Sequence, residues 1–82
     1  MDAVVVLSGA TSWRVETADS WKPIGVIEEL TDGKFHVVAG TANDDHHASP
    51  LWGISHGPFE TLQEAMAAIS VKLGGTCERW RP

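Results

Sequence analysis

Acidic residues and histidines gather in one polar stretch of the sequence. Asp44 and Asp45 precede His46 and His47, and His56 follows further along the chain. Zinc takes three or four N, S or O donors in a tetrahedral arrangement, usually from two anchored segments. Adjacent loop residues converge poorly on one ion, so His56 would have to complete the site. We therefore expect a solvated loop, with weak metal binding through the three histidines as the alternative.

The single cysteine, Cys77, is the candidate nucleophile of the chain. Arg79 stands nearby, and a neighbouring positive charge lowers the pKa of a thiol. Catalysis would also need a histidine within hydrogen-bond reach of the sulfur, which the sequence does not specify. Most free cysteines simply pack as small apolar residues. We therefore expect Cys77 to be an inert, partly buried thiol.

A glycine turn follows the apolar run at residues 3–7, an order that also occurs in nucleotide-binding folds. In those folds a helix begins at the turn and directs its first amides at phosphate. Here residues 13–17 alternate apolar and polar side chains, which indicates a strand instead. We expect no cofactor and, without a catalytic constellation, no enzymatic activity.

Four tryptophans are the residues best suited to binding. Trp13 and Trp52 are expected in the core. Trp21, just before Pro23, and Trp80, between two arginines, have polar and irregular surroundings. Tryptophans at recognition surfaces bring a large contact area at a low entropic cost. Trp21 and Trp80 are therefore candidate partner-binding residues, and capping of the ends of the core is the alternative.

Alternating apolar residues and turn residues predict an antiparallel β-meander. The Asp32-Gly33 pair suits the positive φ angles of a tight hairpin turn. The apolar run at residues 3–7 is either a strand or an ordered arm. The expected strands lie at residues 13–17, 24–30 and 34–39, followed by a polar loop at 40–50 and a short edge strand at 51–54.

One helix is expected at residues 61–73. Thr61 and Glu64 have the spacing of a capping box, and Gly74 can end the helix in a left-handed conformation. Apolar residues recur at helical spacing, so they form one buried face. This face consists of Leu62, Ala65, Met66, Ile69 and Leu73.

A small apolar strip lies opposite that buried face, where charged residues would be expected. It contains Ala67, Ala68 and Val71. Alanine is the best helix former, which is a sufficient reason for its presence. The alternative is that Ala67 and Val71 contact a second copy of the chain or a helix of a partner protein.

These elements predict one α+β domain over residues 1–82, an antiparallel meander of three or four strands covered on one face by a single C-terminal helix. The predicted parts are an N-terminal arm or edge strand at 1–12, the meander at 13–56 with its loop at 40–50, the helix at 61–73, and a tail or last edge strand at 76–82. The helix is expected to pack on Val15, Val26, Phe35 and Val37, or on their alternating neighbours. The other sheet face stays open, and an open face is a place for interaction.

The charge balance disfavours nucleic acid as a partner. Eleven acidic and six basic residues give a net charge of -5, whereas nucleic-acid affinity comes mostly from neutralised phosphates. A nucleic-acid binder would need a basic face, which only Arg14, Lys22, Lys34 and Arg79 could form. The first apolar run is too short for a signal peptide or a membrane span. We therefore expect a small soluble cytoplasmic protein without a membrane partner.

A structural motif completes the sequence pattern. The run Gly57-Pro58-Phe59-Glu60-Thr61-Leu62-Gln63-Glu64-Ala65, after the hairpin around Asp32 and Gly33, resembles small uncharacterised bacterial proteins from Burkholderia-type proteobacteria. In those proteins a β-meander ends in a GPF-x-T-x-x-EA helix entrance. The resemblance spans residues 13–73 and implies the fold, but no activity, cofactor or site residue.

The expected function is that of a non-enzymatic protein-binding or adaptor module, which binds another protein or a second copy of itself. Trp21, Trp80, Ala67 and Val71 are its candidate contact residues. A nucleic-acid-binding module is one alternative, and a weak metal-binding protein that uses the loop from Asp44 to His47 is another.

Overall fold

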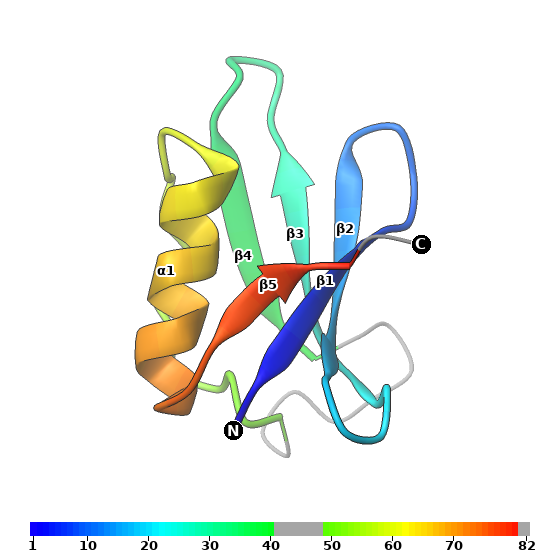
Figure 1. Ribbon diagram of the computed structural model, residues 1–82. Helices are drawn as coiled ribbons and strands as arrows, with labels where there is room; N and C mark the ends of the chain where they lie inside the picture. Colours follow the sequence, from blue (N-terminus) through cyan, green and yellow to red (C-terminus); the bar gives the residue numbers. More distant parts are fainter. Residues whose placement is uncertain (41–48, 81–82) are drawn as a thin grey trace.

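The computed structural model describes residues 1–40 and 49–80 and contains one five-stranded sheet and one helix (Figure 1). This confirms the predicted α+β class, with its antiparallel meander and single C-terminal helix packed on the sheet. The elements are β1 (Ala3–Leu7), β2 (Ser12–Thr17), β3 (Pro23–Glu29), β4 (Phe35–Ala39), α1 (Leu62–Leu73) and β5 (Cys77–Arg79).

The strand order in the sheet is β4-β3-β2-β1-β5. Neighbouring strands from β1 to β4 are antiparallel, whereas β5 is parallel to β1. The helix contacts both β4 and β5 and carries the chain from one edge of the sheet to the other, so that β5 pairs with β1 instead of β4. Both ends of the chain contribute a strand. The first strand is not at the edge as predicted, because it lies inside the sheet between β2 and β5, whereas β5 forms the edge.

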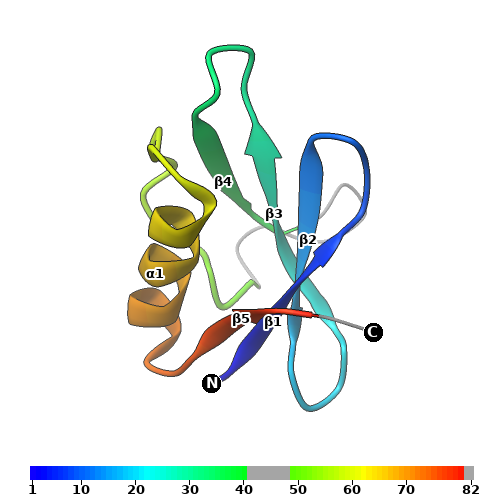
Figure 2. The ribbon, with the colours of Figure 1, turned by 45° about the horizontal axis from the view of Figure 1, so that its top comes forward.

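The core lies between α1 and one face of the sheet (Figure 2). Val15 and Val37 face the helix as predicted, but Val26 points to the opposite face and Ile27 takes the inward place. Strand pairing fixes this register, because Val15 lies opposite Gly25 and successive side chains alternate. The buried core side chains are Ala3, Val5, Trp13, Val15, Ile24, Ile27, Val37, Ala39, Leu51, Ile54, Leu62, Ala65, Met66 and Ile69.

The segment around Leu51 forms turns rather than the predicted edge strand. The Ser49 hydroxyl donates to the Ile24 carbonyl at 2.5 Å and accepts from the Leu51 amide at 3.1 Å. These bonds hold Leu51 over β3, where its side chain is 0 % exposed. A Cβ atom on Gly25 would lie 2.7 Å from the Leu51 Cδ1 atom. Glycine at this strand position therefore makes room for a core side chain from an irregular segment.

The helix begins and ends at the capping residues that the sequence predicted. The Thr61 side chain accepts a hydrogen bond from the Glu64 amide at 3.1 Å, while the Glu64 carboxylate accepts from the Glu60 amide at 2.9 Å. Gly74 adopts the left-handed conformation at the C-cap, with φ of 69°. In the part of the chain that the structure describes, no helix has the length and apolarity needed to cross a membrane.

The outer edge of β4 is closed by residues 56–59. Phe35 and Phe59 exchange two backbone hydrogen bonds, each 2.8 Å long. The Val37 amide donates to the His56 carbonyl at 3.1 Å, and the His56 Nδ1 atom donates to the Val37 carbonyl at 2.7 Å. Unpaired edge strands are sites for further strand pairing. This edge is therefore protected.

The start of β1 is tied to the chain that leaves the helix. The Thr76 amide donates to the Asp2 Oδ1 atom at 2.9 Å, and the Ala3 amide donates to the Thr76 carbonyl at 2.8 Å. A backbone hydrogen bond stabilises the charged carboxylate. The bond from Thr76 accordingly holds the pKa of Asp2 below its ordinary value.

We expect this contact to make a small contribution to stability that depends on pH. A lowered pKa stabilises the fold above the unfolded pKa of about 3.9, and the contribution is lost as pH falls through the lower folded pKa. Asp2→Asn should therefore lower the melting temperature slightly at about pH 6, and the gap from the parent should narrow as the pH falls below about 3.9. Thermal unfolding followed by circular dichroism measures the melting temperatures of the parent and the variant at each pH. A gap that stays constant across this range would contradict the assignment.

Candidate binding surface

The sheet face opposite α1 carries four half-buried valines: Val4, Val6, Val26 and Val38. We call this face of β1 to β4 the open face, because no helix or strand within residues 1–40 and 49–80 packs across it. Partly exposed aliphatic side chains on neighbouring strands provide apolar contact area. The prediction of one covered and one open face agrees with this arrangement.

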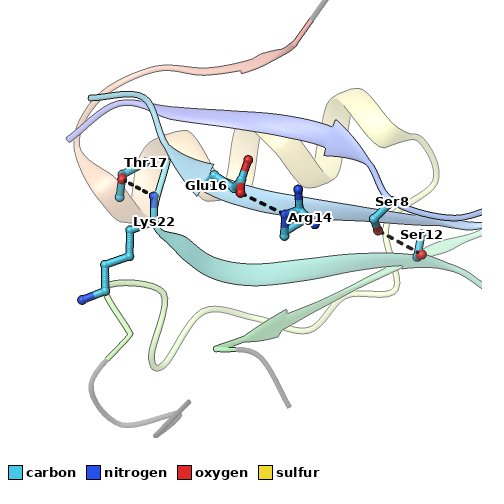
Figure 3. A network of polar contacts seen from close by, with 6 residues as sticks. All are labelled: Ser8, Ser12, Arg14, Glu16, Thr17 and Lys22. Carbon is cyan, nitrogen blue, oxygen red and sulfur yellow. Dashed lines mark hydrogen bonds and ion pairs between the residues drawn. The ribbon is translucent and has the colours of Figure 1, made fainter. Parts of the chain in front are cut away.

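An ion pair lies among these valines. The Arg14 Nε atom donates to the Glu16 Oε2 atom at 2.9 Å (Figure 3). Glu16 is only 6 % exposed, while Arg14 is exposed. The two side chains point the same way because they are two residues apart on β2. The arginine therefore neutralises the one deeply placed carboxylate of the open face.

Trp21 and Trp80 come together although one lies between β2 and β3 and the other follows β5. Their ring centroids are 6.1 Å apart, and the ring planes are at 84°, an edge-to-face arrangement. The two residues are 47 % and 46 % exposed. We call them the tryptophan pair. Both sequence candidates are thus on the surface and in contact with each other.

The backbone at Trp21 has an unusual conformation. Its φ angle is 56°, a left-handed value that costs a bulky residue about 1–2 kcal/mol. Hydrogen bonds of the turn hold it there: the Trp21 amide donates to the Thr17 carbonyl at 2.8 Å, and the Lys22 amide donates to the Thr17 hydroxyl at 3.1 Å (Figure 3). Such outliers cluster at functional sites. The turn presents this indole in a fixed position.

Acidic side chains dominate the charge of the open face. The alternation along each strand places Glu28 beside His36 and Glu78 beside Val4 on this face. Glu28 and Glu78 have no ion pair in the described part of the chain, whereas the charge of Glu16 is offset by Arg14. The face therefore favours a positively charged partner.

The basic residues do not form the face that nucleic acid would require. Arg14 lies on the open face and Arg79 on the helix side, by strand alternation. Lys34 pairs with Glu60 at 3.4 Å near the opposite sheet edge. Dispersed positive charges neutralise few neighbouring phosphates.

Of the candidate metal ligands, His46 and His47 lie outside the described residues. His56 packs against His36 with ring centroids 5.2 Å apart, and its Nδ1 atom is engaged by the Val37 carbonyl. Within residues 1–40 and 49–80, no group of three or more histidine, cysteine or carboxylate side chains is placed to hold a metal ion. His56 therefore has a structural contact, as part of the segment that closes β4.

Cys77 is not the activated thiol that a nearby arginine would produce. Burial, with a smaller contribution from the charge of Glu78, raises its pKa to about 11. The expected influence of Arg79 is outweighed because desolvation disfavours the thiolate. The thiol is partly buried, as predicted, and its inertness stays a prediction.

The helix strip and the fourth tryptophan lie on other surfaces. Ala67, Ala68 and Val71 line a shallow groove of about 450 Å³ with residues 53–55 and Phe59, and Val71 is 83 % exposed. This groove is on the outer side of α1, away from the open face. Trp52 is 49 % exposed, so its expected place in the core is wrong. A turn carries it, and Leu51 fills the core instead.

Sequence reasoning identified both indoles of the tryptophan pair but not their contact, nor the ion pair of Arg14 and Glu16. The period-2 pattern of residues 13–17 places those two side chains on one face, so that pair could have been found. The contact between the indoles depends on β5 pairing with β1, which no local pattern shows. Comparison with protein-family models, curated proteins and solved structures found no match for this chain.

Proposed function

We propose that this protein is a non-enzymatic binding module that takes a basic segment of another protein against its open face. The observation that carries the proposal is the tryptophan pair. Two large side chains from distant parts of the sequence lie together and stay about half exposed. Exposed tryptophans are over-represented among the residues that contribute most to binding energy.

The chemistry around the pair supports a cationic partner. A lysine or arginine over an indole face gains about 0.5–2 kcal/mol from the ring quadrupole. Glu78 lies two residues before Trp80 and therefore adds a carboxylate on the same side of the sheet. Half-buried Val4 and Val6 supply apolar contact next to it. The surface can therefore bind the charged end and the aliphatic stem of a basic side chain together.

Selection from a library of displayed random peptides of about ten residues tests the function. We expect peptides rich in lysine and arginine to be enriched on the parent protein. Trp21→Ser with Trp80→Ser should weaken their binding by about tenfold or more, because the cation–π and apolar contacts are lost. Fluorescence anisotropy with a labelled selected peptide measures the change.

Val71→Ser is the matched control, because it removes an exposed apolar side chain on the far side of the helix. Its binding should equal that of the parent. Circular dichroism establishes that each variant is folded. Enrichment of acidic peptides, or equal binding by the control and the double variant, would refute the proposal.

A further inference from the structure

We propose that the outer edge of β5 accepts an extended segment of a partner protein as a sixth strand of the sheet. This inference rests on the proposed function and names how the partner binds. Addition of a strand to a free sheet edge is a common mode of peptide recognition, in which main-chain hydrogen bonds give affinity and side-chain pockets give specificity.

The hydrogen bonds of β5 show which of its backbone groups are free. On the inner side, the Thr76 carbonyl accepts from the Ala3 amide at 2.8 Å, and the Trp80 amide donates to the Val5 carbonyl at 2.9 Å. Alternate residues of a strand direct their amides and carbonyls to the same side. The amides and carbonyls of Cys77 and Arg79 therefore point outward, where no partner is present in the described part of the chain.

One outer edge of the sheet is covered by another segment of the chain, and the other edge is not. Residues 56–59 cover the outer edge of β4 with four hydrogen bonds to Phe35 and Val37. No described segment does this for β5, which is the opposite edge (Figure 1). Proteins usually blunt or cover an edge strand that must not pair. Because the β4 edge is covered and the opposite β5 edge is not, β5 is the edge at which a further strand can pair.

A groove follows the open edge. It has a volume of about 480 Å³ and lies between β5 and the first half of α1. Gln63 and Met66 form its helix side, while Cys77 and Arg79 form its strand side. Figure 2 shows β5 leaving the C-terminal end of the helix and turning away from it toward β1. The space along the edge is therefore shaped by a strand and a helix, which suits an extended chain.

The chain that enters β5 is anchored by contacts with other parts of the fold. The Asp2 carboxylate binds the Thr76 amide, and the Ser70 hydroxyl donates to the Gly75 carbonyl. Gly75 lies so close to the Met1 carbonyl that a Cβ atom would collide with it. An ordered edge loses little conformational entropy when a peptide binds, which favours affinity.

Charge and alternation define the partner. Side chains of an added strand point alternately to the two faces. Those on the open face meet Glu78 and Trp80, which favours lysine or arginine, and those on the other face meet the groove beside Met66, which favours small apolar residues. A second copy fits less well, because an antiparallel pair of β5 strands centred on Glu78 places two glutamates opposite each other. The occupant is therefore an extended segment that alternates basic and small apolar residues.

A pair of substitutions at Arg79 isolates the backbone bond. Arg79→Pro removes the outward amide without touching the ladder to β1, and proline is tolerated on the outer side of an edge strand. Arg79→Ala removes the same side chain but keeps the amide. With a labelled peptide selected on the parent protein, Arg79→Pro should bind about tenfold more weakly than Arg79→Ala, the value of one backbone hydrogen bond. Circular dichroism shows whether both variants are folded.

A second measurement does not depend on substitution. Amide hydrogen exchange should slow at Cys77 and Arg79 when the parent protein binds the selected peptide, because the new strand protects both amides. Equal peptide affinity of the proline and alanine variants, or unchanged exchange at both amides, would overturn the edge proposal. If the edge proposal failed in this way but the double variant with Trp21→Ser and Trp80→Ser still lost binding, the proposed function would stand without the edge proposal. Self-association of the parent that Arg79→Pro abolishes would assign the edge to a second copy and also overturn the proposal.

Discussion

Leu51→Ala is expected to lower the free energy of unfolding by about 3–4 kcal/mol. A loss of this size is typical of a core residue, although Leu51 lies in a turn. Leu51 is fully buried, and it packs where Gly25 leaves space on β3. The cavity would be hard to close, because Gly25 has no side chain to move and the sheet backbone is fixed by its ladder. Urea unfolding followed by tryptophan fluorescence measures the loss.

The control is Val71→Ala on the exposed side of the helix, which should change stability by less than about 0.5 kcal/mol. A loss below about 1 kcal/mol for Leu51→Ala would show that the segment over Gly25 does not belong to the core.

Cys77 is expected to react with iodoacetamide about a hundredfold more slowly in the folded protein than in urea, both at about pH 8. Only the thiolate reacts, and its fraction at this pH falls steeply when the pKa rises from about 8.5 in the unfolded chain to about 11 in the fold. Mass spectrometry over time gives both rates. Equal rates for the folded and the unfolded protein would contradict the burial of the sulfur.

The same shift predicts how alkali affects stability. A raised folded pKa means that folding favours the protonated thiol, so the contribution is complete below about pH 8.5 and is lost as pH rises toward 11. Cys77→Ala should remove this part of the decline. The residue therefore behaves as a packing group whose ionisation opposes folding.

Local patterns predicted the elements that depend on local forces. Thr61, Glu64 and Gly74 mark the ends of the helix because capping requires only neighbouring residues. The Asp32-Gly33 turn likewise predicted the hairpin of β3 and β4. Strand alternation gave the two faces of β2, including the inward side of Trp13.

Features that depend on distant parts of the chain were not predictable in this way. The parallel pairing of β5 with β1 joins the two ends of the sequence, and the tryptophan pair follows from it. Leu51 became a core residue only because Gly25 lies beneath it. Val26 was assigned to the wrong face because a run of apolar residues in β3 has no clear alternation, and pairing with β2 decides its register.

The adjacency of β1 and β5 also affects how the fold can form during synthesis. β1 can pair with β5 only after the rest of the meander and the helix have been synthesised, since these elements lie between the two strands in the sequence. Contacts between such distant segments raise the contact order and slow folding. Until β5 has emerged, β1 has an unpaired edge, which exposes the nascent chain to aggregation or to a chaperone. The last step of folding on this route is closure of the sheet by the strand that we propose as the docking edge.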